Sequence, residues 1–149
     1  MSQPPTDILI IGAGPIGLAH AWGLKKLNPH LNIKILEKYP TYQRKHVLNM
    51  KPASLEALMK VVDAMKDPQL SSLLKKLKKR RYIRTSELES IFKKCVFEQG
   101  VEIVYEEVNE QNIQYYLLKY QPKLVIGADG THSVVNKALF PKGNQIKLE

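Results

Sequence analysis

The stretch DILIIGAGPIGLAHAWGL, residues 7–24, decides the fold that this chain adopts. Residues 7–11 form a short apolar run that ends at a glycine, a pattern typical of a buried parallel strand. A helix is expected over residues 15–27, because Pro15 suits a first turn, where its missing N–H costs no hydrogen bond. The run NIKILEK, residues 32–38, predicts a second strand, so the three elements form a β-α-β unit.

Between the first strand and the helix, three glycines follow the pattern G-x-G-x-x-G. The first glycine allows a tight turn, the second lets a diphosphate approach the backbone, and the third lets the helix pack closely. The N–H groups at the helix start then face the phosphates. A tight turn without a ligand is the alternative. We assign cofactor binding to Gly12, Ala13, Gly14, Pro15, Ile16 and Gly17.

An acidic residue at the end of the second strand completes this fingerprint. Glu37 lies about 20 residues after Gly17, where a carboxylate accepts hydrogen bonds from the hydroxyls of an adenosine ribose. The same charge repels a ribose 2′-phosphate, which disfavours NADP at this site. Glu37 and the adjacent Lys38 are therefore assigned to the ribose end of an ADP-containing dinucleotide. These residues alone do not distinguish FAD from NAD.

The rest of the chain continues to alternate between helices and strands. A loop is expected over residues 39–52, and a basic helix after Pro68. Further helices are expected over residues 54–66, 85–100, 110–120 and 131–140, and further strands over residues 101–107 and 123–129. This alternation predicts an α/β, Rossmann-like fold with a mainly parallel sheet and helices on both faces. Without repeats or a linker, residues 1–149 are expected to form one domain.

The composition is that of a globular protein, with 44% hydrophobic and 25% charged residues. The N-terminus lacks the basic start and apolar centre of a signal peptide, and no apolar stretch is long enough to span a bilayer. Cys95 is the single cysteine, so a disulfide framework is excluded and a reducing compartment is favoured. A cytoplasmic location is expected.

The formal net charge of +9 is concentrated in one segment. Six cations lie in KKLKKRR, Lys75–Arg81, after leucines that share one face of a helix. One interpretation is a solvated face of an amphipathic helix. The other is docking on an acidic partner protein or an anionic membrane surface. Nucleic-acid binding is not expected, since the run lacks interleaved aromatic residues and a known reader motif.

The stretch LVIGADGTHSVVNKAL, residues 124–139, is similar to the G-A-D-G-x-x-S-x-V-R stretch of FAD-dependent monooxygenases of the aromatic-hydroxylase type, which share a fold with the ubiquinone hydroxylases. Asp129, Gly130 and Ser133 match it, while Asn136 stands where the family usually has arginine. The resemblance implies that Asp129 and Gly130 approach the FAD diphosphate. It favours FAD over NAD as the cofactor.

A second resemblance is local. Residues 44–52, RKHVLNMKP, are similar to the R-N-N-V-L-H-L-W-P segment of MICAL-type monooxygenase domains. His46 replaces an asparagine and Lys51 replaces the tryptophan. The resemblance implies that this loop passes near the flavin ring, with its arginine close to the cofactor. The matching positions are Arg44, Val47, Leu48 and Pro52.

The resemblance also implies a reaction. In the family, NAD(P)H reduces the flavin, which then activates oxygen for hydroxylation of a substrate. Family members continue into a substrate-covering β-sheet and a second Gly-Asp motif, and these 149 residues contain neither. The chain is thus interpreted as the N-terminal portion of a larger flavoprotein, or as a non-catalytic nucleotide-fold module. If the chain is such a portion, the surface that normally meets the substrate domain is uncovered, which predicts dimerisation or poor solubility. No catalytic residue is assigned.

Other reactive residue types have structural interpretations. The hydroxyl of Ser133 is expected to cap a helix, and Cys95 to lie in the core rather than act as a reactive thiol. A metal site is not expected, because the histidines lack metal-ligand spacing. These histidines are His20, His30, His46 and His132.

Overall fold

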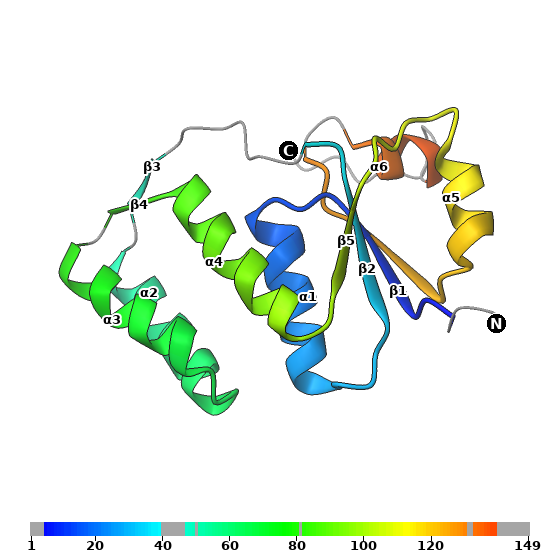
Figure 1. Ribbon diagram of the computed structural model, residues 1–149. Helices are drawn as coiled ribbons and strands as arrows, with labels where there is room; N and C mark the ends of the chain where they lie inside the picture. The colour runs from blue at the N-terminus through cyan, green and yellow to red at the C-terminus, as the bar shows by residue number, and fades with distance from the viewer. Residues whose placement is uncertain (1–4, 40–46, 50, 81, 131–132, 140–149) are drawn as a thin grey trace.

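The computed structural model describes residues 5–39, 47–49, 51–80, 82–130 and 133–139. Its elements alternate along the chain between strands and helices (Figure 1). In chain order they are β1 (Ile8–Ile11), α1 (Pro15–Leu27), β2 (Ile33–Glu37), β3 (Val47–Asn49), α2 (Pro52–Ala64), α3 (Pro68–Arg80), β4 (Tyr82–Arg84), α4 (Thr85–Glu98), β5 (Glu102–Tyr105), α5 (Ile113–Tyr120), β6 (Leu124–Gly127) and α6 (Val134–Leu139).

Four strands form a parallel sheet in the order β5-β2-β1-β6. In β1, one of the two inner strands, Ile10 pairs with Ile35 of β2 on one side and with Ile126 of β6 on the other. Helices α1 and α4 cover one face of the sheet, and α5 and α6 cover the other (Figure 1). The predicted α/β architecture with helices on both faces is therefore confirmed.

The strand β1 is apolar at every position because both of its faces are buried. Ile8 and Ile10 belong to the large core cluster that includes α1 and α4. Leu9 packs in the cluster of Tyr116, and Ile11 in that of Ile113, both on α5. This two-sided burial is the physical origin of the continuous run in the sequence.

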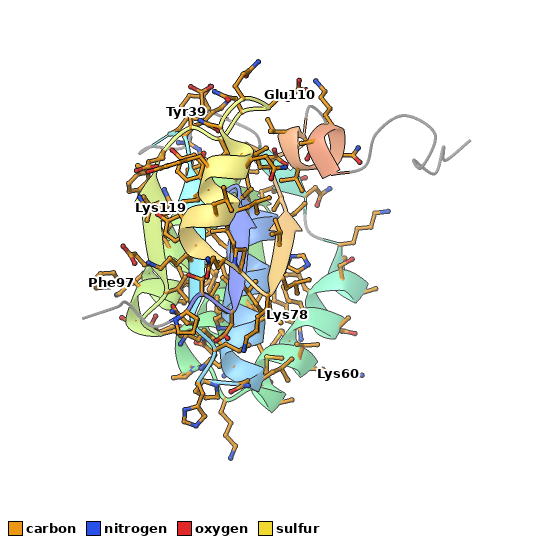
Figure 2. The ribbon with its side chains drawn as sticks, turned by 90° about the vertical axis from the view of Figure 1, so that its right-hand side faces the viewer. Tyr39, Lys60, Lys78, Phe97, Glu110 and Lys119 are labelled. Atoms are coloured by element: carbon orange, nitrogen blue, oxygen red, sulfur yellow. The ribbon has the colours of Figure 1, made fainter. Side chains whose placement is uncertain are left out.

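The outer surface of α5 is aromatic and cationic. The ammonium of Lys119 lies 5.9 Å from the ring centroid of Tyr115 and 5.3 Å from that of Tyr120. Figure 2 shows this side of the molecule, with Lys119 on α5. These cation–π contacts lie at the surface of the molecule.

Helices α2 and α3 form a hairpin on the far side of α4 from the sheet (Figure 1). Its apolar side chains belong to the same core cluster as α1, and the buried ones are Leu55, Val62, Leu70, Leu74 and Leu77. Among the described residues, no helix combines the length and the apolar character needed to cross a bilayer.

One expectation was wrong. Within the expected loop of residues 39–52, β3 forms and pairs antiparallel with β4, so that Val47 lies opposite Arg84 and Asn49 opposite Tyr82. A strand of three residues is too short to show alternation in a sequence, and its partner is distant in the chain. In addition, α2 begins at Pro52, two residues before the predicted start.

The turn between α2 and α3 is anchored by a buried aspartate. The indole N–H of Trp22 donates to Oδ2 of Asp67 at 2.6 Å, and the backbone N–H of Leu70 donates to Oδ1 at 3.1 Å. The ammonium of Lys26 lies 3.5 Å from the same carboxylate. Asp67 therefore caps α3 and also ties the helical hairpin to α1.

The ionised form of Asp67 is favoured in the folded chain. Burial alone raises the pKa of this carboxyl, but the hydrogen bonds from Trp22 and Leu70 and the charge of Lys26 outweigh burial. The pKa of Asp67 therefore lies below its ordinary value of 3.8.

We expect Asp67→Ala to lower the free energy of unfolding by about 2 kcal/mol, because α3 loses its cap and the indole of Trp22 loses its acceptor. Thermal unfolding followed by circular dichroism measures this. Because folding lowers the pKa of Asp67, the stability that Asp67 contributes is complete above pH 3.8, its ordinary pKa. This stability is lost as the pH falls through the pKa that Asp67 has in the folded chain. Asp67→Asn, which keeps a hydrogen-bond acceptor, should lower the free energy of unfolding less than Asp67→Ala does. An unchanged unfolding temperature in Asp67→Ala would contradict this account.

Candidate dinucleotide-binding site

The glycine-rich turn lies at the carboxyl edge of the parallel sheet. The backbone N–H of Gly12 donates to the carbonyl of Leu36 at 2.8 Å, which ties the turn to β2. The N–H of Ala128, just after β6, donates to the carbonyl of Ile11 at 2.8 Å. The chain after β1 crosses to β2, while β6 lies on the other side of β1, so the sheet order reverses here. Ligands of open α/β sheets bind at such switch points.

Two of the three glycines are required by the fold itself. Gly12 has a φ of 109°, and a Cβ there would lie 2.2 Å from the carbonyl oxygen of Ala128. At Gly17 a Cβ would lie 2.1 Å from the carbonyl oxygen of Gly12. Both positions therefore exclude any side chain, because the atoms in the way belong to the backbone.

Gly14 differs from the other two. Its φ of −73° and ψ of 178° suit any residue, and a Cβ there would meet nothing within 4 Å. Gly14 is the N-cap residue of α1, and its helix has no acidic residue in the first turn. No carboxylate of α1 therefore neutralises the positive end of the helix dipole. The N–H groups of the first turn favour the binding of an anion there. The packing of the chain does not require glycine at this position.

The structure brings Glu37 to the glycine-rich turn. The N–H of Ala13 donates to Oε2 of Glu37, and the N–H of Tyr39 donates to Oε1 at 3.2 Å. The carboxylate is therefore held beside the start of α1, at the end of β2. The next residue, Lys38, is exposed and its ammonium lies 4.8 Å from the ring centroid of Tyr39.

A second acid lies near this edge, and the sequence analysis missed it. Glu89 on α4 is 3% exposed, and its Oε1 lies 2.8 Å from the ammonium of Lys93. Its Oε2 has no hydrogen-bond partner within the described residues. The pKa of Glu89 lies above its ordinary value, mainly because burial disfavours the charged carboxylate. The charge of Glu37 raises this pKa further, and the ion pair with Lys93 offsets only part of the increase. In the sequence, the spacing of Glu89 and Lys93 indicates only a surface ion pair.

The segment after β6 also reaches the turn. Asp129 accepts hydrogen bonds from the hydroxyl of Ser133 at 2.5 Å and from the N–H of Val134 at 2.8 Å. The Oγ of Ser133 in turn accepts from the N–H of Asn136 at 3.0 Å. The predicted capping role of Ser133 is confirmed, and Asp129 shares it. Gly130 has a φ of 88°.

The remaining candidate residues are Cys95, the histidines and Arg44. Cys95 is buried, and burial raises the pKa of its thiol to about 11, so its predicted core position is confirmed. In the part of the chain that the structure describes, no three His, Cys, Asp or Glu residues could hold a metal ion. Arg44 and His46 lie outside the described residues, so the MICAL-type resemblance stays a prediction.

Comparison with known proteins identifies the fold but not a family. No protein-family model and no curated protein sequence matches the chain. Solved structures do match. PqsL from Pseudomonas aeruginosa, described as a probable FAD-dependent monooxygenase, is 17% identical with a TM-score of 0.61. CabE, an aromatic hydroxylase from angucycline biosynthesis, is 16% identical with a TM-score of 0.63.

The match is nearly complete for this chain and partial for its neighbours. It covers 97% of this chain and 46% of PqsL. For CabE the values are 92% and 33%. The fold defined by the sheet and the glycine-rich turn is thus part of the fold of flavin-dependent monooxygenases. The chain spans about a third to a half of the length of these proteins.

We expect Glu89→Gln to stabilise the chain at pH 8 by on the order of 1 kcal/mol, because it removes a buried charge with one unpartnered oxygen. Since folding raises the pKa of Glu89, the wild type loses stability as the pH rises through the pKa that Glu89 has in the folded chain. The stability that Glu89→Gln gains over the wild type should therefore shrink as the pH falls toward 4.5, the ordinary pKa of a glutamate. Thermal unfolding across this range measures it. Glu98→Gln, on the exposed face of the same helix, serves as the control. A gain independent of pH would contradict this assignment.

Proposed function

We propose that this chain is the FAD-binding part of a flavin-dependent monooxygenase and the N-terminal portion of a larger flavoprotein. The open position at Gly14 carries the proposal, because its glycine is explained by a ligand that approaches the backbone and not by the packing of the chain. The likeness to FAD-dependent monooxygenases supports FAD over NAD.

The described residues fit the two ends of the ADP moiety. The backbone of Gly12–Gly14 and the N–H groups at the start of α1 would hold the diphosphate, since the helix dipole favours an anion there. The carboxylate of Glu37 would accept hydrogen bonds from the ribose hydroxyls. These would replace the hydrogen bonds that it accepts from the N–H groups of Ala13 and Tyr39 in the structure. The exposed Lys38 is assigned to the same end.

The middle of the cofactor would lie over the end of β6. The side chain of Asp129 is occupied by capping α6, so this segment would contribute the backbone of Asp129 and Gly130. We assign Arg44 to the same region.

The bound flavin would supply the redox chemistry of the whole protein, with NAD(P)H as the reductant. The part of the protein described here binds and orients the cofactor. This role requires no catalytic side chain, and we assign none. The substrate would be covered by further sequence, as the partial coverage of the neighbours suggests.

We expect Gly14→Val to weaken FAD binding about 100-fold, equal to about 2.7 kcal/mol, because the added side chain fills the space through which the diphosphate approaches. Titration of the chain with FAD, followed by flavin fluorescence, measures this. The unfolding temperature should fall only slightly, because nothing lies within 4 Å of the new Cβ and the remaining cost is that valine is a poorer N-cap residue than glycine.

Gly12→Ala is the matched control, because it places a methyl group against the carbonyl of Ala128 and should destabilise the fold itself. Wild-type affinity for FAD in Gly14→Val would refute the assignment. Stronger binding of NAD than of FAD would indicate an NAD-dependent oxidoreductase. Binding of neither cofactor would favour a nucleotide-fold module without catalysis.

A further inference from the structure

One face of α3 carries a dense array of cations. We call Lys75, Lys76, Lys78 and Lys79 the lysine face. All four side chains are exposed. The leucines of the opposite face, Leu70, Leu74 and Leu77, are buried in the main core. The apolar side of the helix is therefore already covered by the chain, whereas the lysine face meets solvent.

The lysine face is not neutralised by neighbouring acids. None of its four residues forms an ion pair with a described residue, and α3 contains no Asp or Glu. Arg80, in the last position of the helix, does pair with Glu87 at 2.8 Å.

The fold gains little from this arrangement. Lys75 lies three and four residues before Lys78 and Lys79, and like charges at these spacings destabilise a helix. The helix dipole favours cations in the last turn, which accounts for Lys78 and Lys79 but not for Lys75 and Lys76.

The position of α3 leaves this face accessible. The helix is at the periphery of the molecule, on the far side of α4 from the sheet and away from the glycine-rich turn (Figure 1). Next to its carboxyl end is a hollow of about 420 Å³ whose lining includes Arg84 and the paired Arg80 and Glu87. The lysine face lies outside this hollow, on the exposed side of α3.

We propose that the lysine face docks the protein on a membrane surface that contains anionic phospholipids. Lysine ammoniums are point charges that need no fixed partner geometry, which suits a fluid layer of headgroups. The four residues share a single helix face and do not line the hollow, so their arrangement lacks the shape expected of a pocket for an acidic peptide. The buried leucines make the contact electrostatic, without insertion of α3 into the bilayer.

Co-sedimentation of the chain with vesicles tests the proposal. Vesicles with about 30% phosphatidylserine in phosphatidylcholine should bind the wild type, and pure phosphatidylcholine should not. Each lysine contributes about five-fold to such binding, so replacing all four by Gln should weaken it by about 600-fold. Salt at about 0.5 M should release the wild type.

The control removes the same four charges elsewhere and should change vesicle binding by less than about three-fold. Its substitutions are Lys25→Gln, Lys94→Gln, Lys119→Gln and Lys137→Gln. An equal loss in both variants would overturn the proposal, because net charge alone would then explain binding. So would absence of binding to anionic vesicles; retention on polyglutamate in that case would indicate an acidic protein partner. FAD titration of the lysine-face variant should match the wild type, which separates this test from that of the proposed cofactor.

Discussion

The close approach of the backbone at Gly12 to the carbonyl of Ala128 is the constraint on which the rest of the site depends. It brings the turn after the first strand against the end of β6, the last strand of the parallel sheet. Any Cβ at position 12 would collide with that carbonyl. The same contact sets the segment that begins at Asp129 beside the start of α1. The glycine-rich turn and the segment after β6 lie far apart in the chain. They form one surface because Gly12 has no side chain and lets the two backbones come into direct contact.

The parts of the fold that could be predicted from the sequence are those with a strong local signal. The buried run of β1, the proline at the start of α1 and the acid at the end of β2 each report a local requirement of the chain. Half of the role of Asp67, the cap of α3, has a local signal that the sequence analysis missed, because an acid directly before Pro68 is a helix-start signal. Its other half, the hydrogen bond from Trp22, joins residues 45 positions apart and has no sequence pattern.

The parts that could not be predicted depend on tertiary contacts. The strands β3 and β4 have three residues each and are stabilised mainly by pairing with one another. Glu89 has the spacing of a surface ion pair, yet the packing of α4 buries it to 3% exposure near the charge of Glu37. The candidate site therefore contains an acid whose importance comes from burial, a property of the folded chain that its neighbours in the sequence do not encode.

The three glycines differ in what would keep them unchanged as sequences diverge. A chain of this fold that no longer bound a nucleotide would still need glycine at positions 12 and 17, because backbone atoms exclude a side chain there. Position 14 would be free to drift toward serine, asparagine or aspartate, which are better N-cap residues. Glycine at this position forgoes a capping hydrogen bond that another residue would provide. Position 14 is therefore where relaxed selection would first become visible in descendants of this chain.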